Sequence, residues 1–358
     1  MLSPREAVRT LPSYHPPLAG RDGLRLDFNE NTAGCSPRVL ERLRQLAPEQ
    51  LASYPEREPV EAAVAAMLGV AAPELLLTNG VDEAIHLLCG TYLEPGDEAL
   101  IVVPTYSMYR IYMMAAGAQV ISVPAAAGFT FPVEDVCSRI SPRTRLMAIA
   151  NPNNPTGSVA PPDDLRRLAR SAPDAAVLVD EAYFEFYGQS MLAVRERFPN
   201  LFVARTFSKA YGLAGLRIGV LAGDADQMRA VRRVSSPYNV NAVALACLPE
   251  ALGDQEYIEQ YVNEVRESRL RLEQLLTASR IQFWPSEANF VLARVGAASS
   301  FVEHMRRRGI LVRDRSSDQS CEGCVRITLG PRAHADRLLT ALQETLDELG
   351  IAQGTSRR

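Results

Sequence analysis

Residues 206–217 read TFSKAYGLAGLR, which puts a lysine, Lys209, directly after Ser208 and ahead of a glycine-containing turn. Arg217 ends the segment. A lysine amine so placed can form an imine, while a serine hydroxyl and an arginine hold a phosphate beside it. This is the chemistry of pyridoxal 5′-phosphate (PLP), in which the protein supplies the amine and the anion site and the cofactor supplies the electron sink. The segment therefore predicts a PLP site.

The length, the composition and the net charge indicate what kind of protein this is and which partners it binds. The chain has 358 residues, of which 47% are hydrophobic and 22% are charged, as in a globular protein of two domains. Its net charge of -4 provides no basic field for nucleic acid or for an anionic membrane. The expected partners are therefore small molecules, with no nucleic acid and no membrane.

The termini and the cysteines bear on the compartment and on metals. No apolar run of signal-peptide length follows Met1, and no stretch approaches the roughly 20 apolar residues of a membrane span. We therefore expect a cytoplasmic protein whose six cysteines are reduced thiols. The only close pair, Cys321 and Cys324, lacks a second ligand pair for zinc and the context of a thioredoxin-like site. No metal is predicted.

Short apolar segments alternate with amphipathic stretches between about residue 70 and residue 225. The expected strands are residues 75–77, 99–103, 120–123, 146–150, 176–179, 202–204 and 218–221. Because their apolar content is continuous, helices should cover both faces of the sheet. The pattern predicts an α/β fold with a mostly parallel seven-stranded sheet, and a ligand site off the carboxyl ends of its strands.

Beyond about residue 254 the pattern changes to a long helix, with Ile258, Tyr261 and Val265 on one apolar face. Strand-like and helical segments then alternate up to residue 349, which predicts a smaller α+β domain. The proline-rich first residues are expected to pack on it. We therefore predict a large PLP-binding domain at residues 30–250 and a small domain formed by residues 1–29 and 251–358.

Asp180 and Tyr183 follow the expected strand at residues 176–179. A carboxylate at that sheet end can pair with the pyridine nitrogen of PLP and keep it protonated, which makes the ring a strong electron sink. Tyr183 could hydrogen-bond the phenolic oxygen of the ring. The alternative is that Asp180 simply caps the next helix. The presence of Lys209 after the next strand favours the cofactor role.

Three other segments follow expected strands. Residues 151–157, NPNNPTG, make a rigid loop in which an asparagine amide can point at a ligand oxygen. Residues 78–83 open a helix, and the backbone amides of Gly80, Val81 and Asp82 can hold a phosphate there. Tyr106 could stack on the pyridine ring, although a core or surface tyrosine would look the same.

Arg313 and Arg326 each follow an apolar residue in a strand-like segment near the C-terminus. Arginine holds a carboxylate or a phosphate with two parallel hydrogen bonds. Isolated arginines are mostly surface charges, so these two are substrate-binding candidates only because of the other motifs.

With these residues collected, the chain resembles the fold-type I PLP-dependent aminotransferases of class I/II, and most closely the histidinol-phosphate aminotransferases. The resemblance extends over nearly the whole chain. It is carried by residues 27–31, 54–55, 80–83, 151–157, 180–183, 206–217, 286–290 and 326–330.

The resemblance implies a role for each matching residue in the cofactor site. Lys209 would hold PLP as an imine and, once freed by substrate, would act as the base. Asp180 would pair with the pyridine nitrogen, Tyr183 and Asn154 would hold the phenolic oxygen, and Tyr106 would stack on the ring. The phosphate would lie among Gly80, Val81, Asp82, Ser208 and Arg217.

The resemblance also implies a homodimer in which Tyr54 reaches the cofactor phosphate of the neighbouring subunit. Arg326 matches the arginine that binds the substrate anion, and Asn154 is a further substrate-binding candidate. Arg313 and Tyr14 match positions near the substrate phosphate in the histidinol-phosphate enzymes.

The implied reaction exchanges an amino group between L-histidinol phosphate and 2-oxoglutarate, a step of histidine biosynthesis. Nearly the same motifs serve aromatic aminotransferases, for instance with phenylalanine as donor. A lyase similar to L-threonine-O-3-phosphate decarboxylase would share the fold and the phosphate recognition. A PLP-binding regulator is disfavoured because the chain has no basic stretch and no room for a DNA-binding domain.

Overall fold

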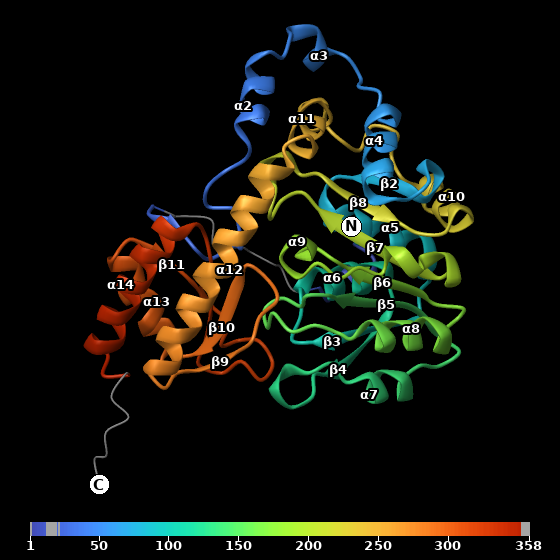
Figure 1. The fold of residues 1–358 in the computed structure, drawn as a ribbon. Helices are drawn as coiled ribbons and strands as arrows, with labels where there is room; N and C mark the ends of the chain where they lie inside the picture. The colour runs from blue at the N-terminus through green and yellow to red at the C-terminus, as the bar shows by residue number, and fades with distance from the viewer. Residues whose placement is uncertain (1, 12–19, 21, 352–358) are drawn as a thin grey trace.

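The computed structural model describes residues 2–11, 20 and 22–351 (Figure 1). A seven-stranded sheet with the strand order β2-β8-β7-β6-β5-β3-β4 lies at its centre. These strands are β2 (Leu75–Thr78), β3 (Glu98–Val103), β4 (Gln119–Pro124), β5 (Thr144–Ala150), β6 (Ala176–Asp180), β7 (Leu201–Thr206) and β8 (Gly219–Ala222). All seven predicted strands are confirmed, with small shifts at their ends.

The sheet is mostly parallel, as predicted. Strands β3 to β7 run side by side in one direction, and β8 is antiparallel to β7. Because β2 is in turn antiparallel to β8, it runs in the same direction as β7. The carboxyl ends of all strands except β8 therefore meet at one edge of the sheet, where β8 begins. The turns that follow β2, β5, β6 and β7 converge at this edge.

Helices cover both faces of this sheet (Figure 1). On one face Leu178 and Phe202 are buried with residues of three helices, α5 (Gly80–Tyr92), α6 (Ser107–Ala116) and α10 (Ala225–Val234). On the other face Val177 and Val179 are buried with residues of α4 (Glu58–Leu68), α8 (Pro162–Ser171) and α11 (Ala242–Leu252). Successive side chains of a strand point to opposite faces, so the continuous apolar runs of the sequence supply both cores.

A second, antiparallel sheet lies beside the first, with the strand order β12-β13-β10-β9. Its strands are β9 (Gln282–Trp284), β10 (Phe290–Arg294), β12 (Arg313–Asp314) and β13 (Cys324–Thr328). It packs with α12 (Gln255–Ala278) and α13 (Ala298–Arg307), and α14 (Arg332–Glu348) packs on both of these helices. The predicted smaller α+β part is therefore present.

The predicted domain boundaries at residues 30 and 250 stay a prediction. Within residues 1–29 the two described elements contact different parts of the fold. Strand β1 (Leu24–Arg25) pairs with β11 (Ile310–Leu311), next to the second sheet. Helix α1 (Glu6–Arg9) lies against α6, and the preceding Arg5 donates to the carbonyl of Ala115 at 2.6 Å. The first residues thus contact the helix layer of the large sheet as well.

The other described helices are α2 (Pro37–Arg44), α3 (Pro48–Ala52), α7 (Val133–Ser138) and α9 (Phe184–Tyr187). Short 3-10 turns cover Ala72–Glu74, Ala127–Phe129, Leu192–Arg197 and Ala214–Leu216. Across the described ranges, no helix has both the length and the apolar content that crossing a membrane requires.

Candidate active site

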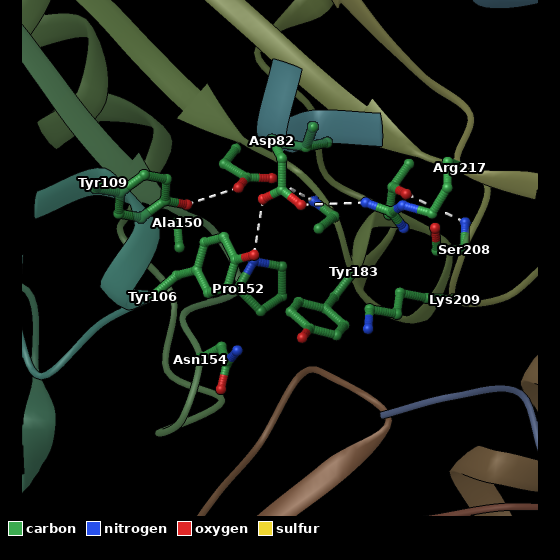
Figure 2. Close-up of a pocket in the computed structure, with 14 residues that line it drawn as sticks. Asp82, Tyr106, Tyr109, Ala150, Pro152, Asn154, Tyr183, Ser208, Lys209 and Arg217 are labelled. Atoms are coloured by element: carbon green, nitrogen blue, oxygen red, sulfur yellow. Dashed lines mark hydrogen bonds and ion pairs between the residues drawn. The ribbon is translucent and has the colours of Figure 1, made fainter. Parts of the chain in front are cut away.

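A pocket opens at the carboxyl edge of the seven-stranded sheet, where the turns after β2, β5, β6 and β7 meet (Figure 2). Nine of the residues predicted from the sequence line it: Val81, Asp82, Tyr106, Asn154, Asp180, Tyr183, Ser208, Lys209 and Arg217. They come from five separate turns and helix ends, so the fold brings together residues that lie up to 136 positions apart in the chain.

Lys209 lies in the turn after β7, and its Nζ donates to the carbonyl of Phe28 at 3.1 Å. The same Nζ is 6.0 Å from the ring centre of Tyr183. Burial, and secondarily the positive charge of Arg326, lowers the pKa of Lys209 to about 8. At a pKa of about 8, roughly a tenth of this amine is neutral at pH 7, far more than for an ordinary lysine, and the neutral amine is the form that a Schiff-base nucleophile and a base both require.

Lys209 is also the only lysine in the chain, since every other residue in the Lys-plus-Arg total of 38 is an arginine. Arginine cannot replace it in this chemistry because its guanidinium stays protonated. The single lysine thus lies where a neutral amine is useful. Counting the lysines in the sequence would have singled out Lys209 without any motif.

Asp180 is the last residue of β6, and its buried carboxylate accepts two hydrogen bonds. Tyr109 donates its hydroxyl to Oδ2 at 2.6 Å, and the amide of Ala182 donates to Oδ1 at 3.1 Å. Burial raises the pKa of Asp180 to about 6, although both hydrogen bonds act in the opposite direction. The next helix, α9, has Tyr183 rather than Asp180 at its N-cap position. Asp180 is therefore not the cap of that helix, and its carboxylate lines the pocket.

This raised pKa predicts how Asp180 affects the stability of the cofactor-free protein. Because folding raises the pKa from 3.8 to about 6, the group stabilises the fold fully only below pH 4, and that contribution is lost as the pH rises through 6. Asp180→Asn should therefore stabilise the apoprotein at pH 8 by about 2–3 kcal/mol and have little effect at pH 4. Urea denaturation at both pH values measures this difference.

Asp163→Asn is the matched control, because that carboxylate is 91% exposed and should change the stability little at either pH. Equal stability of Asp180→Asn and the unsubstituted apoprotein at pH 8 would contradict the burial of a charged Asp180.

Two asparagines, Asn29 and Asn154, form hydrogen bonds with side chains in or next to the pocket. Asn29 donates to the hydroxyl of Tyr183 at 2.9 Å, and Asn154 accepts at its side-chain oxygen from Arg326 at 2.6 Å. Arg326 also donates to the carbonyl of Asp27 at 2.6 Å, while its buried Nε has no partner among the described residues. Burial lowers the pKa of Arg326 to about 10, so the guanidinium stays charged at neutral pH. Asn154 thus connects the pocket to a buried cation.

A possible anion site lies at the N-terminus of α5. Helix α5 begins at Gly80, so the amides of Gly80, Val81 and Asp82 belong to its first turn, where backbone N–H groups have no partner within the helix. The carboxylate of Asp82 accepts from the Tyr106 hydroxyl at 2.7 Å and forms an ion pair with Arg217 at 3.1 Å. The chain approaches itself closely here, since a Cβ at Gly80 would lie 2.7 Å from the guanidinium of Arg217.

The pocket fits PLP on one observation in particular. The buried hydroxyl of Ser208 has no hydrogen-bond partner among the described residues, and it lines the pocket together with Val81, Asp82 and Arg217. A phosphate there would accept from the hydroxyl, from the amides of α5 and from Arg217. Asp180 and Lys209 lie in the same pocket, so the groups expected to contact the pyridine nitrogen and the aldehyde are also present.

Three predicted residues lie elsewhere. Tyr54 is 77% exposed and stacks on Tyr238, with 4.2 Å between the ring centres, and it does not line this pocket. Arg313 pairs in register with Arg326 on the neighbouring strand, and its guanidinium lies 5.3 Å from the ring centre of Phe28. Tyr14 lies outside the described residues. The roles given to these three residues stay predictions.

Two residues that contact the predicted ones were not predicted from the sequence. Tyr109 is fully buried and bonds Asp180, and Asn29 bonds Tyr183. Tyr109 lies one helical turn after Tyr106, so the pairing of the two aromatic residues at this spacing was a usable signal. Asn29 is 154 positions from its partner, and no local pattern indicated that contact.

The described residues contain no group of three or more His, Cys, Asp or Glu side chains placed to hold a metal ion. Cys321 and Cys324 are buried free thiols, and Cys324 is the first residue of β13, an inner strand of the second sheet.

Comparison with known proteins identifies a family and similar relatives. A sequence model described as aminotransferase class I and II matches residues 21–342. The chain is 36% identical over 294 residues to a histidinol-phosphate aminotransferase of Caldanaerobacter subterraneus subsp. tengcongensis, covering 82% of this chain and 83% of the relative. It is 32% identical over 328 residues to the protein of the same name from Cytophaga hutchinsonii, covering 90% and 92%.

Among solved structures, the fold is similar to that of histidinol-phosphate aminotransferase from Sinorhizobium meliloti in complex with pyridoxal-5′-phosphate. The TM-score is 0.84 and the sequence identity 27%, over 96% of this chain and 97% of that one.

Proposed function

The chain belongs to the class I and II aminotransferase family, and on this premise we propose that it transfers the amino group of L-histidinol phosphate to 2-oxoglutarate. The products are imidazole acetol phosphate and L-glutamate, and PLP is the cofactor. The observation that carries the choice of donor is the identity, over most of the chain, to relatives that bear this name. The pocket supports the type of reaction, because a low-pKa lysine and a buried carboxylate lie together in it.

We assign each residue of the pocket a separate role in the reaction. PLP, when bound, supplies an electron sink for the charge that develops at the donor's α-carbon. Lys209 would hold the cofactor at its aldehyde carbon, and its Nζ, once released, would take the proton from the donor's α-carbon. Asp180 holds a proton on the pyridine nitrogen. The hydroxyl of Tyr183 and the amide of Asn154 orient the ring through its phenolic oxygen.

The substrate site must bind a phosphate monoester in one half-reaction and a dicarboxylate in the other. Both are anions, and two arginines on neighbouring strands suit both better than a neutral pocket would. We assign to Arg326 the anion contact that the two substrates share, and to Arg313 and Tyr14 contacts with the phosphate of the donor.

This assignment predicts a selective effect of Arg313. Arg313→Ala should raise the KM for histidinol phosphate by roughly 10–100-fold, the loss expected for a charge-assisted hydrogen bond, and leave kcat nearly unchanged. The KM for phenylalanine, which has no phosphate, should change little. Arg294→Ala is the control, because its guanidinium lies over Trp284 at the opposite end of the second sheet. Equal losses with both donors would contradict the phosphate contact.

We further propose that the active unit is a cytoplasmic homodimer in which Tyr54 contacts the cofactor phosphate of the partner subunit. Tyr54 and Tyr238 form an exposed aromatic pair, and Leu51 in the same region is 58% exposed. Exposed aromatic side chains of this kind are typical of an interface. Since Tyr54 does not line the pocket of its own chain, contact across a dimer is the way for it to reach such a site.

Mixing two variants, each of which lacks a different part of the proposed composite site, tests this arrangement. In a mixed dimer of Lys209→Ala and Tyr54→Phe subunits, the subunit with an intact Lys209 receives an intact Tyr54 from its partner, so one site is complete. The mixture should be more active than either variant alone. A mixture that forms mixed dimers by native mass spectrometry and gains no activity would show that Tyr54 does not act across the interface.

A comparison of amino donors tests the proposed function. The loaded enzyme is supplied with 2-oxoglutarate and, separately, with histidinol phosphate, phenylalanine or phosphothreonine, and kcat/KM is measured for each. The highest value is expected for histidinol phosphate. A higher value for phenylalanine would identify an aromatic aminotransferase, and carbon dioxide release from phosphothreonine without a keto acid would identify a lyase.

A further inference from the structure

We infer that Asn239 is a positioning residue for the cofactor phosphate, because it fixes the turn between β2 and α5. Asn239 does not line the pocket, and it lies in the loop between α10 and α11. This inference rests on the proposed function, which places the phosphate at the N-terminus of α5.

Asn239 joins three segments through its side-chain amide. Its Nδ2 donates to the carbonyl of Leu77 at 2.9 Å and to the carboxylate of Glu83 at 2.7 Å, and its Oδ1 accepts from Arg57 at 2.6 Å. Leu77 is in β2 and Glu83 is in the first turn of α5. One side chain therefore holds both ends of the turn that presents the anion site.

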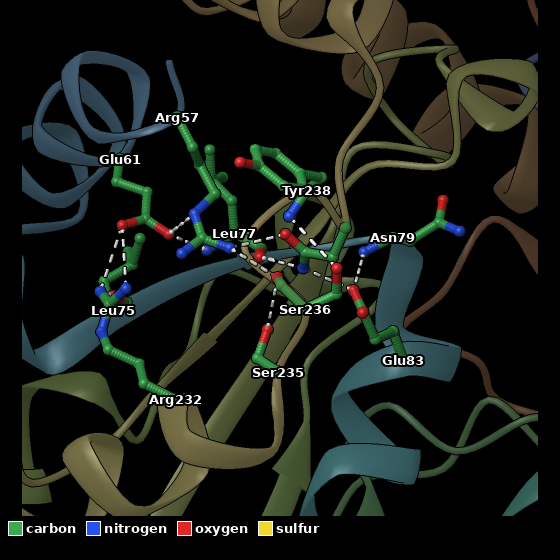
Figure 3. A network of polar contacts seen from close by, with 11 residues as sticks. Arg57, Glu61, Leu75, Leu77, Asn79, Glu83, Arg232, Ser235, Ser236 and Tyr238 are labelled. Carbon is green, nitrogen blue, oxygen red and sulfur yellow. Dashed lines mark hydrogen bonds and ion pairs between the residues drawn. The ribbon is translucent and has the colours of Figure 1, made fainter. Parts of the chain in front are cut away.

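Glu83, which is held by Asn239, in turn accepts a hydrogen bond from the backbone at the start of α5. The same carboxylate oxygen that accepts from Asn239 also accepts from the amide of Asn79 at 2.5 Å, and Asn79 is the N-cap residue of α5 (Figure 3). The next residues along the chain are Gly80, Val81 and Asp82. Loss of the Asn239 contact therefore removes one of the two hydrogen bonds that hold this carboxylate oxygen, and so weakens its restraint on the amide of Asn79.

Arg57, which donates to Asn239, and Leu77, which accepts from it, are both held by Glu61. Glu61, whose side chain is 5% exposed, accepts from the amide of Leu77 at 2.9 Å and pairs with Arg57 at 3.0 Å and with Arg232 at 3.2 Å (Figure 3). A buried carboxylate with this many partners has one favourable position. Arg57, held by Glu61, in turn fixes the orientation of the Asn239 amide.

The turn itself has little room to adjust. Gly80 has a φ of 72°, and a Cβ at Gly219 on the neighbouring strand would lie 3.1 Å from the amide nitrogen of Val81. Hydrogen bonds from backbone amides to a phosphate depend on their direction. A small displacement of this turn therefore weakens phosphate binding without moving Lys209 or Asp180.

The test compares two ligands that differ only in the phosphate. Dissociation constants for PLP and for pyridoxal are measured by equilibrium dialysis with the unsubstituted protein, Asn239→Ala and Gln227→Ala. Both ligands can react with Lys209, so a change in the ratio of the two constants between variants reports on the phosphate contact. Gln227 is the matched control, because its side chain accepts from Tyr92 at 2.9 Å, at the opposite end of α5.

We expect Asn239→Ala to reduce the preference for PLP over pyridoxal by about tenfold, and Gln227→Ala to leave it unchanged. Asn239→Asp should behave like Asn239→Ala, because it keeps the shape and the acceptor for Arg57 but cannot donate to Leu77 or Glu83. An unchanged preference in Asn239→Asp, or an equal loss for both ligands, would overturn the inference. If the unsubstituted protein itself does not prefer PLP over pyridoxal, the proposed phosphate site fails, and the inference fails with it.

Discussion

Lys209→Ala should lower the rate of amino-group transfer by roughly 10⁴-fold, the upper end of what a positioned base contributes. It should also abolish the covalent attachment of PLP, since the chain has no second lysine side chain. Steady-state kinetics measure the first effect. Borohydride reduction followed by intact-protein mass spectrometry measures the second, because reduction makes a lysine–PLP bond permanent.

Two controls separate the amine of Lys209 from the rest of the site. Lys209→Arg keeps the positive charge but cannot form the bond or act as a base, so it should be as inactive as Lys209→Ala. The Lys209→Ala variant should still bind PLP in equilibrium dialysis through the anion site and Asp180. A mass increase of one PLP in the reduced Lys209→Ala protein would place the attachment elsewhere, at the N-terminal amine.

Asp180→Asn should lower the transfer rate by roughly 10²–10³-fold, the loss expected when one charged group facing the transition state is removed. An asparagine amide keeps the size of the side chain but cannot hold a proton on the pyridine nitrogen. This variant is informative because its apoprotein should be more stable than the unsubstituted one at pH 8, so a loss of activity could not come from unfolding. A variant retaining more than about a tenth of the activity would refute the role of Asp180.

Tyr109→Phe provides a graded comparison for Asp180. The hydroxyl of Tyr109 donates to Asp180 and thereby lowers the pKa of that carboxyl. Its loss should raise the pKa of Asp180, so the acidic limb of the pH–rate profile should move to higher pH. The loss of activity should therefore be larger near pH 6 than at pH 8.

The sheet and its site could be predicted because the pattern is local. Continuous apolar runs such as residues 176–179 identify buried strands, and a parallel sheet brings the residues after such strands to one edge. That rule places Asp180, Asn154 and Lys209 in one pocket, although they lie in three different turns. The antiparallel β8 did not disturb the prediction, because Arg217 lies just before the end of β8 that starts at this edge.

The rest depends on contacts between distant residues. Asn29 reaches Tyr183, and Asn239 reaches Leu77 and Glu83, across 154 to 162 positions of the chain. Hydrophobic periodicity carries no information about such pairs. The role of Tyr54 cannot be derived from one chain, because its side chain is 77% exposed there and its proposed contact is with a second chain. The identity of the amino donor is likewise set by side chains such as Arg313, whose residue type alone does not distinguish a phosphate from a carboxylate.

A single-turnover measurement distinguishes amino-group transfer from histidinol phosphate from the alternative reactions. The PLP-loaded protein is mixed with L-histidinol phosphate in the absence of any keto acid. The amount of imidazole acetol phosphate formed is then divided by the amount of protein subunits. We expect one equivalent of this product per subunit, no carbon dioxide, and formation of one equivalent of L-glutamate when 2-oxoglutarate is then added. No imidazole acetol phosphate above background, with a full equivalent of phenylpyruvate formed from phenylalanine under the same conditions, would contradict it.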